Sequence, residues 1–410
     1  MFWLGFLLFA LGILFSVCLH EAGHMLTAKA YGMKVTQYFA GFGPKIWSFR
    51  RGETEYGVKA IPAGGYVKIV GMTPLEPVAP EDDARAFWRA PLRRRTVVLA
   101  AGSLTHFGLA IVVAYIAALT TGLPNMAWQD FDPAKAAPVV EVTDCVIPVP
   151  NRGECAPGDP AGAAKAAGLQ DGDRILAVGS TPVASYGDLV KVLQAAPAGA
   201  TEVRYERAGA EQTATVGLVP VQRYAPDATD DNPTTRQVSA IGVSVVEPAR
   251  TLHYGALGAV AGTASFGKEL FTGTFEAIGR FPSRIDDLVT AIGGGERSAE
   301  TPVSVLGASR IGGEAFELGE PIVFLTIFIS LNVFIGVFNL FPLLPLDGGH
   351  IAIAWYERAR AIVARRRGRP DPGRVDYEKL LPLTYAVMLV FVSVSLLALT
   401  ADIVNPIRLS

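Results

Sequence analysis

The stretch Cys18-Leu19-His20-Glu21-Ala22-Gly23-His24 lies at the end of an apolar run, since residues 1–19 carry no charged side chain. On a helix, positions i and i+4 share one face, so His20 and His24 can bind a single cation. Glu21 would lie beside that cation and could take a proton from a water molecule that the cation activates. This spacing is the His-Glu-x-x-His pattern of zinc hydrolases. It predicts a Zn²⁺ site inside a hydrophobic span, with Glu21 as the general base.

A plainer interpretation is that the two histidines are bonded to neighbouring backbone groups and that Glu21 lies at a membrane interface. Ionisable side chains inside a membrane are costly, and they mark functional sites by default. The whole chain has only five histidines, so pairing around a glutamate by chance is improbable. The metal site is therefore the favoured interpretation.

The composition is that of a membrane protein with room for a soluble module. Half of the 410 residues are hydrophobic and 18% are charged, and the length exceeds that of one ordinary domain. A net charge of −2 gives no sign of a nucleic-acid partner. Four segments are apolar enough to cross a bilayer of about 30 Å. These segments, residues 1–27, 96–121, 321–350 and 381–403, predict a polytopic α-helical membrane protein.

Basic clusters predict how the chain is oriented, because Lys and Arg concentrate on the cytosolic side. The clusters Arg93-Arg94-Arg95 and Arg365-Arg366-Arg367 place the loop 73–95 and the link before the last span in the cytosol. The amino terminus, the long segment 122–320 and the carboxy terminus then lie outside. Within that segment, residues 252–320 are expected to be interfacial or amphipathic. The first apolar run lacks a basic leader, so we expect a retained span rather than a cleaved signal peptide.

The cysteines fit this orientation. Cys145 and Cys155 lie ten residues apart in a Pro- and Gly-rich segment on the outside, where a disulfide is permitted. We expect them to pair, and the alternative is two unpaired thiols. Cys18 precedes His20 by two residues, so it would point away from the metal face and serve in packing.

Residues 40–72 are expected to form a β region next to the first two spans. Gly41-Phe42-Gly43-Pro44 is followed by short alternating runs, the last of which begins at Gly64-Gly65-Tyr66. Open strand edges are not tolerated in hydrocarbon, so such a region needs a cover of protein or of bound peptide. An unpaired edge could hold an unwound substrate by strand addition. The alternative is a plain cytosolic hairpin.

Residues 136–220 have the composition of a small soluble α/β module. Gly168-Leu169-Gln170-Asp171-Gly172-Asp173 precedes an alternating strand, and an amphipathic helix begins at Tyr186. This pattern is typical of a bacterial PDZ domain, a fold that binds extended peptides at a sheet edge, commonly through their carboxy termini. The alternative is a spacer that binds nothing.

A second chemical cluster ends the third span, where Asn339-Leu340-Phe341-Pro342-Leu343-Leu344-Pro345-Leu346-Asp347-Gly348-Gly349-His350 carries two prolines and two glycines. These residues would break a helix at membrane depth, which makes sense beside a hydrated cavity. Asp347 would be the third zinc ligand and leave a fourth position for water. Alternatively, Asp347 caps a following helix. His106 in the second span and His350 are weaker ligand candidates.

With both clusters in view, the chain resembles the site-2 protease family of intramembrane zinc metalloproteases, and it looks most like bacterial members with a single PDZ domain. The resemblance covers nearly the whole chain. It implies zinc binding by His20, His24 and Asp347 and general-base catalysis by Glu21. For substrate binding it implies Asn339 together with the Gly-rich β region, a membrane re-entrant sheet, here represented by Gly41, Phe42, Gly43, Gly64, Gly65 and Tyr66.

The chain departs from the family pattern at two places. The second proline before the aspartate is shifted, although the separation of Asn339 from Asp347 is unchanged. In the second span, Ser103 and His106 occupy the places of a family proline and asparagine, which puts any role of that asparagine in doubt.

The function expected from these features is hydrolysis of transmembrane segments in single-span proteins that another protease has already trimmed. By resemblance, the substrates are anti-sigma factors or similar regulators, and the enzyme lies in a bacterial plasma membrane with its PDZ domain outside. Two other classes remain open. One is a non-catalytic membrane scaffold that captures peptides, and the other is a metal transporter.

Overall fold

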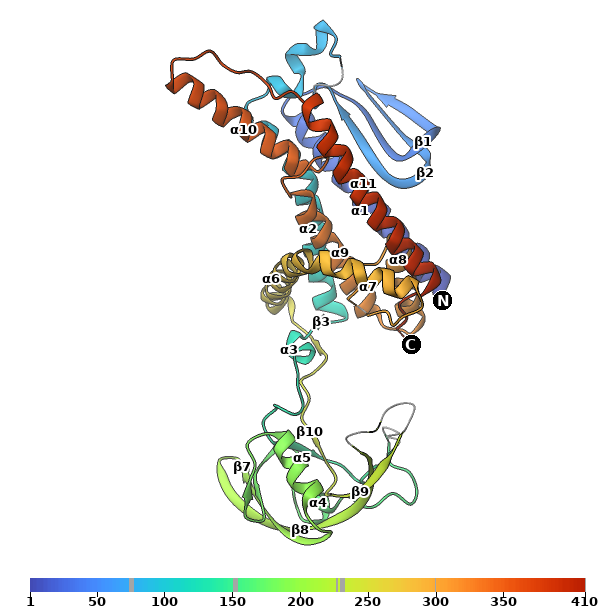
Figure 1. The fold of residues 1–410 in the computed structure, drawn as a ribbon, viewed down its shortest axis with the longest axis vertical. Coiled ribbons are helices and arrows are strands. Elements are labelled where there is room, and N and C mark those ends of the chain that lie inside the picture. Colours follow the sequence, from blue (N-terminus) through green and yellow to red (C-terminus); the bar gives the residue numbers. More distant parts are fainter. Residues whose placement is uncertain (74–76, 150–153, 226–227, 229–232, 299, 410) are drawn as a thin grey trace. The chain divides into compact units, whose positions relative to one another are not determined.

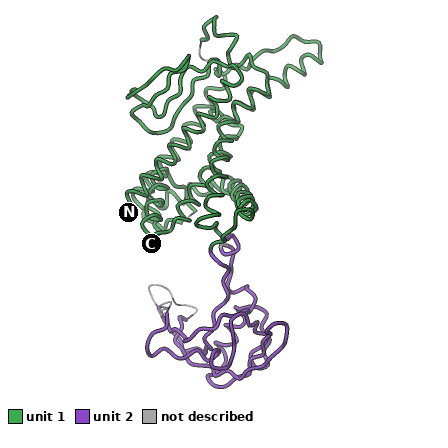
Figure 2. Tube along the Cα trace, turned by 180° about the vertical axis from the view of Figure 1, so that it is seen from behind, with its two compact units in different colours: residues 1–124, 251–410 green, residues 125–250 purple. Residues whose placement is uncertain are grey.

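The structure is a computed structural model that describes residues 1–73, 77–149, 154–225, 228, 233–298 and 300–409. The chain forms two compact units, which Figure 2 shows in different colours. One unit joins the two ends of the chain, Met1–Pro124 and Thr251–Ser410, and the other is Asn125–Arg250.

Four long apolar helices dominate the first unit (Figure 1). They are α1 (Phe2–Ala30), α2 (Leu92–Thr120), α9 (Pro321–Asn339) and α11 (Leu381–Val404). Within the described residues, these are the helices long and apolar enough to cross a membrane, the last one counted from Glu378. They coincide with the four predicted spans, so the chain is a polytopic membrane protein. In its centre, α2 packs against both α1 and α9.

The third predicted span is broken, as its prolines suggested. Helix α9 ends at Asn339, and a new helix, α10 (Asp347–Arg366), begins at Asp347. Both prolines lie in the link between the two helices. The Arg-rich part of α10 was expected only as a cytosolic link, because its charges interrupt the apolar pattern. Asp347 is thus both a ligand candidate and the first residue of a helix.

Residues 252–320, which were expected to be interfacial or amphipathic, contain helices α6 (Ala256–Arg280), α7 (Arg284–Ile292) and α8 (Val305–Glu317). Helix α6 is long, but it is not among the apolar candidate spans. Its exposed apolar side chains include Leu257, Phe271 and Phe275. The short elements of the first unit are 3-10 turns: η1 (Pro80–Arg85), η2 (Phe87–Arg89), η3 (Phe281–Ser283) and η4 (Glu378–Leu380).

The β region is a long antiparallel hairpin of β1 (Val35–Arg51) and β2 (Thr54–Ile69). Strand β1 begins before the predicted β region of residues 40–72. Its first part, Val35–Ala40, pairs on one side with Gly65–Ile69 and on the other with Glu55–Val58. The hairpin can fold back in this way because Gly41 and Gly43 adopt φ values of +87° and +81°, a region that disfavours residues with a Cβ.

The second unit is built on an antiparallel sheet with strand order β10-β4-β5-β7-β8-β9 and β6 paired to β5. Its core gathers Val140, Leu169, Ile175, Leu189, Val203 and Val216. The unit is longer than the predicted range 136–220, because β9 and β10 complete the sheet. Its elements are α3 (Met126–Gln129), β4 (Val139–Val142), α4 (Ala163–Ala166), β5 (Asp173–Val178), β6 (Thr181–Pro182), α5 (Tyr186–Ala195), β7 (Gly199–Arg207), β8 (Ala210–Tyr224), β9 (Thr235–Ala240) and β10 (Val243–Val245).

Cys145 and Cys155 of this unit form a disulfide, while Cys18 in α1 is free. The two chain segments that connect the units run antiparallel. Strand β3 (Leu123–Pro124) pairs with β11 (Thr251–Leu252). Directly beyond this pairing, the N–H of Asn125 donates to the carbonyl of Arg250 at 2.9 Å.

Candidate metal centre

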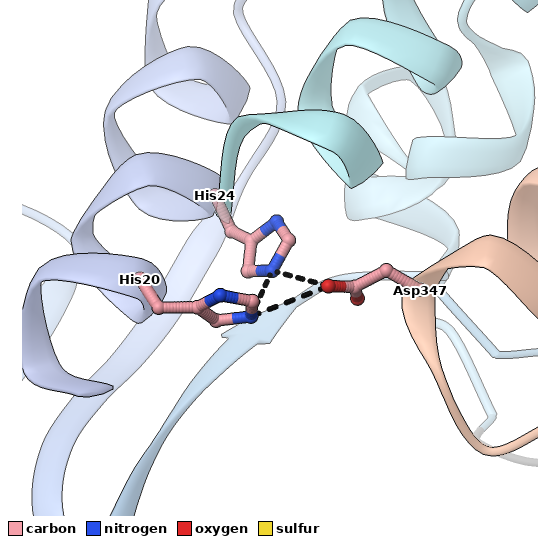
Figure 3. Close-up of side chains that lie close together, drawn as sticks. All are labelled: His20, His24 and Asp347. Carbon is pink, nitrogen blue, oxygen red and sulfur yellow. Dashed lines mark hydrogen bonds and ion pairs between the residues drawn. The ribbon is translucent and has the colours of Figure 1, made fainter. Parts of the chain in front are cut away.

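Three side chains from two helices converge inside the first unit: His20 and His24 on α1, and Asp347 at the start of α10 (Figure 3). The two Nε2 atoms lie 3.1 Å apart. Oδ2 of Asp347 lies 3.2 Å from Nε2 of His20 and 3.3 Å from Nε2 of His24. The i, i+4 spacing places both histidines on one face of α1, and the break before α10 brings the carboxylate to them.

These separations fit zinc. A tetrahedral zinc ion with bonds of about 2.0–2.1 Å to nitrogen and oxygen holds neighbouring ligand atoms about 3.3–3.4 Å apart. The triangle formed by His20, His24 and Asp347 therefore has the size of one face of a zinc tetrahedron. In addition, Oδ2 of Asp347 is buried and makes no hydrogen bond to another described residue. A buried carboxylate oxygen of this kind needs a cation partner.

The orientation of His24 is set by α2. Its Nδ1 lies 2.7 Å from the carbonyl oxygen of Val98. A carbonyl only accepts, so Nδ1 carries the hydrogen and Nε2 presents its lone pair to the metal position. Such a second bond is the usual way in which proteins fix a histidine ligand.

Gly102 on α2 makes room for both imidazoles. A Cβ at this position would lie 2.5 Å from Nε2 of His24 and 2.6 Å from Nε2 of His20. The absence of a side chain at position 102 thus lets α2 approach α1 at the level of the ligand atoms. No role was expected for this glycine from the sequence, although it directly precedes Ser103, which stands at the place of the family proline.

Glu21 lies next to the ligands and faces the β region. A Cβ at Gly65 would lie 3.4 Å from Cγ of Glu21, and the backbone N–H of Val67 faces the Glu21 carboxylate. The segment Gly65–Ile69 pairs on one side only, with Val35–Ala40. The carboxyl-terminal part of β2 therefore lies next to the Glu21 side chain.

The other residues expected at the site lie farther from the ligand atoms. Tyr66 stacks between Phe39 and Phe42, with ring centroids 5.7 and 6.1 Å apart. Gly64 lies against the Phe42 ring. Asn339 is the last residue of α9, and its side chain makes no hydrogen bond to another described residue.

The two weaker ligand candidates are not part of the triangle. His350 lies 3.4 Å from the hydroxyl of Tyr377 through its Nδ1. His106 packs its ring on that of His20, with centroids 5.1 Å apart. No sequence pattern singled out the partners of His106, which are Ser16 and Asn332. Their only signal was that they are polar side chains inside apolar spans.

Comparisons with known proteins agree with this geometry. The model of peptidase family M50 matches residues 8–370. The chain is 42% identical to the zinc metalloprotease Rip1 of Mycolicibacterium smegmatis over 416 residues, which cover 100% of this chain and 99% of that protein. It is 41% identical to Rip1 of Mycobacterium tuberculosis strain H37Rv, again over 100% and 99% of the two chains. A putative zinc metalloprotease of Rhizobium meliloti is 29% identical over 90% of this chain and 91% of its own.

The family match covers most of the chain, and the similarity to the mycobacterial proteins runs from end to end. The chain belongs to peptidase family M50, the site-2 protease family of intramembrane zinc metalloproteases.

Proposed function

We propose that this chain is an intramembrane zinc metalloprotease of regulated proteolysis that cleaves the transmembrane segments of single-span membrane proteins after a first cut elsewhere. The observation that carries the proposal is the triangle of ligand atoms from His20, His24 and Asp347, with Glu21 beside it, in a unit made of apolar spans. Buried ionisable groups at such a depth are retained where they serve chemistry.

His20, His24 and Asp347 would hold the zinc ion. When bound, zinc supplies a Lewis acid that polarises the scissile carbonyl and makes water a stronger nucleophile. Glu21 takes the proton of the attacking water and later gives it to the leaving amine, so one water molecule is consumed for each peptide bond. The apolar helices around the site keep other water away from the reaction.

The β region would hold the substrate in an extended form. A peptide bond in a helix is shielded, because its carbonyl is hydrogen-bonded, so the substrate must unwind locally. Among the described residues, the segment Gly65–Ile69 has one strand neighbour, and the N–H of Val67 within it faces the Glu21 carboxylate. A substrate added to this edge would bring its backbone next to the general base. The unbonded amide of Asn339 is a further group that could bind the substrate backbone.

The test is cleavage of a single-span substrate by purified protein in lipid. Glu21→Gln should retain zinc and lose about 10²–10⁴-fold in rate, the usual contribution of a general base. Glu81→Gln, a change at an exposed residue of the turn η1, is the control and should cleave like the wild type. Full activity of Glu21→Gln would overturn the mechanism. A metal-free protein that binds partners without cleaving them would indicate a scaffold, and zinc flux into liposomes would indicate a transporter.

We further propose that Asn125–Arg250 is a PDZ domain that binds peptide termini. A groove of about 360 Å³ lies between helix α5 and the strand segment Val238–Ser244. Leu189, Val190 and Leu193 of α5 give it an apolar wall, and Arg223 adds a cation to the lining. An apolar groove with one cation suits a hydrophobic residue that carries a free carboxylate.

Peptide binding by the full-length chain tests this second proposal. A peptide with an apolar carboxy-terminal residue should bind more tightly than the same peptide with an amidated end. Val190→Glu should weaken both, because it places a carboxylate in the groove wall. Equal binding of the free and amidated peptides would exclude recognition of the terminus.

The orientation follows from the basic clusters. We propose that both termini and the PDZ domain lie outside a bacterial plasma membrane and that anti-sigma-factor-like proteins are the substrates. Single cysteines introduced at exposed positions such as Glu202 and Asp371 would test the orientation. Only the first should react in intact cells with a reagent that does not cross membranes.

A further inference from the structure

The two histidine ligands differ at Nδ1, the ring nitrogen that does not face the metal position: His24 has a hydrogen-bond partner there and His20 has none among the described residues. Nδ1 of His24 donates to Val98 at 2.7 Å. Nδ1 of His20 is buried and has no hydrogen-bond partner among the described residues. If Nε2 of His20 binds zinc, Nδ1 must carry a hydrogen, so a buried N–H is left without an acceptor. Histidine ligands almost always donate this hydrogen to a protein group or a water molecule.

The ring that faces His20 is that of His106 on α2. The two ring centroids lie 5.1 Å apart at an interplanar angle of 48°. His106 is 1% exposed and is not one of the three converging ligands. His106 is therefore a buried neighbour of the His20 ring that is not itself one of the three converging ligands.

The tautomer of His106 can be assigned from its partners. Nδ2 of Asn332 donates to the carbonyl of Phe328 at 2.9 Å, so the amide oxygen of Asn332 faces His106. Nδ1 of His106 lies 2.9 Å from this oxygen, which only accepts. Nδ1 therefore carries the hydrogen, and Nε2 of the neutral ring carries a lone pair.

Ser16 closes the arrangement. Its hydroxyl donates to the amide oxygen of Asn332 and lies 2.9 Å from Nδ1 of His106. Ser16, His106 and Asn332 come from α1, α2 and α9, and all three are at most 2% exposed. These three residues thus form a rigid polar contact between three spans, and this contact fixes the ring plane of His106. No described residue is bonded to the remaining Nε2.

We infer that His106 is the hydrogen-bond acceptor for His20 in the zinc-loaded protein, with Nδ1–H of His20 donating to Nε2 of His106 directly or through one water molecule. Nδ1 of His20 carries a hydrogen without an acceptor, and Nε2 of His106 carries a free lone pair. The two atoms are therefore complementary, and they belong to adjacent buried rings. His106 is then a positioning residue, and Ser16 and Asn332 act by orienting it. The inference rests on the proposed zinc site but is independent of which substrate is cleaved.

The test is the dissociation constant for zinc, measured by competition with a chelator on the purified full-length protein. His106→Phe keeps a ring of similar size without a hydrogen-bond acceptor. It should weaken zinc binding about 10–100-fold, as happens when the residue that hydrogen-bonds a metal ligand is removed. His106→Gln retains a carbonyl acceptor and should restore most of that loss. His253→Phe, a change at an exposed histidine away from the site, is the matched control.

Each outcome decides a different point. Zinc binding by folded His106→Phe that equals that of the wild type would overturn the inference. Equal losses in the Phe and Gln variants would reduce His106 to packing and overturn it as well. If His106→Phe fails to fold, Ser16→Ala provides the test, since it should weaken zinc binding by releasing the His106 ring. A wild-type protein that binds no zinc would overturn the proposed function itself.

Discussion

Arg297 and Asp402 form an ion pair in which Nη2 and Oδ1 lie 2.5 Å apart and both side chains are only 2% exposed. Asp402 lies in the last turn of α11, and its Oδ2 accepts from the N–H of Ser304 at 2.7 Å. Nη1 of Arg297 donates to the carbonyl of Asn405 at 2.7 Å. The pair fastens the carboxyl end of the fourth span to the segment between α7 and α8.

Removing one partner of this pair should be strongly destabilising, because it leaves the other charge buried and unpaired. We expect Asp402→Asn or Arg297→Met to lower the free energy of unfolding by about 3–5 kcal/mol. Arg280→Met removes an exposed pair in which the side chains are 65% and 67% exposed, and it should leave stability unchanged. Thermal unfolding in detergent measures all three. Equal midpoints for the two kinds of variant would contradict a structural role for the buried pair.

Gly102 should be required for the metal site. In Gly102→Ala the new Cβ would stand within 2.6 Å of the zinc-binding nitrogens of both histidines, so the rings or α2 must move. We expect zinc affinity to fall by at least 10-fold, in the range seen when ligand orientation is lost. Gly108→Ala, on the same helix with no atom within 4 Å of the added Cβ, is the control. Unchanged zinc binding by Gly102→Ala would show that the two helices are less closely fitted than described.

The charge of Asp347 should matter more than its shape. Asp347→Asn keeps the size of the side chain but removes the negative charge that two neutral imidazoles need to hold a dication. We expect zinc affinity to fall by more than about 100-fold, which exceeds the loss caused by removing a residue that only hydrogen-bonds to a metal ligand. Metal content after dialysis measures the effect. Asp376→Asn, a change at an exposed carboxylate in the link before α11, should retain the metal fully.

In the second unit, Asp173 is expected to link stability to pH. Burial alone raises the pKa of Asp173, but its hydrogen bonds with Arg207 and with the N–H of Gln170 bring the pKa below its ordinary value. A carboxyl with a lowered folded-state pKa stabilises the fold above its unfolded pKa of about 4 and loses that contribution as the pH falls further. Unfolding of this unit should therefore become easier below about pH 4.

Asp173→Asn should remove most of that pH dependence. The Asp173 side chain is 1% exposed, and its loss should cost on the order of 2 kcal/mol, as for a buried hydrogen bond to a charged group. Asp144→Asn breaks an ion pair whose side chains are 65% and 75% exposed and should leave the pH profile unchanged. An acid transition that stays the same in Asp173→Asn would assign the effect to another carboxylate.

The four spans and the unwound link before Asp347 could be predicted because long apolar runs and prolines act locally. The turn at Ala208 and Gly209 between β7 and β8 is likewise a local feature. These residues adopt φ values of +51° and +81°, as a tight hairpin requires. The i, i+4 spacing of His20 and His24 likewise identified one face of one helix without any tertiary information.

Other features depend on contacts between distant segments, and no local pattern could show them. The bond from His24 to Val98 and the space at Gly102 exist only because α1 and α2 pack at one depth. The start of β1 was missed because Val35–Ala40 is held as a strand by its pairing with two later parts of β2, and a local pattern does not show such a pairing. The polar triangle around His106 joins residues up to 316 positions apart.

The antiparallel pairing of Leu123–Pro124 with Thr251–Leu252 means that the chain leaves the membrane unit and returns to it at the same place. Residues 125–250 are therefore a cassette, and their excision followed by closure with a short turn leaves every other chain connection of that unit intact. Replacement of this cassette would therefore leave the helices that carry His20, His24 and Asp347 with their own connections.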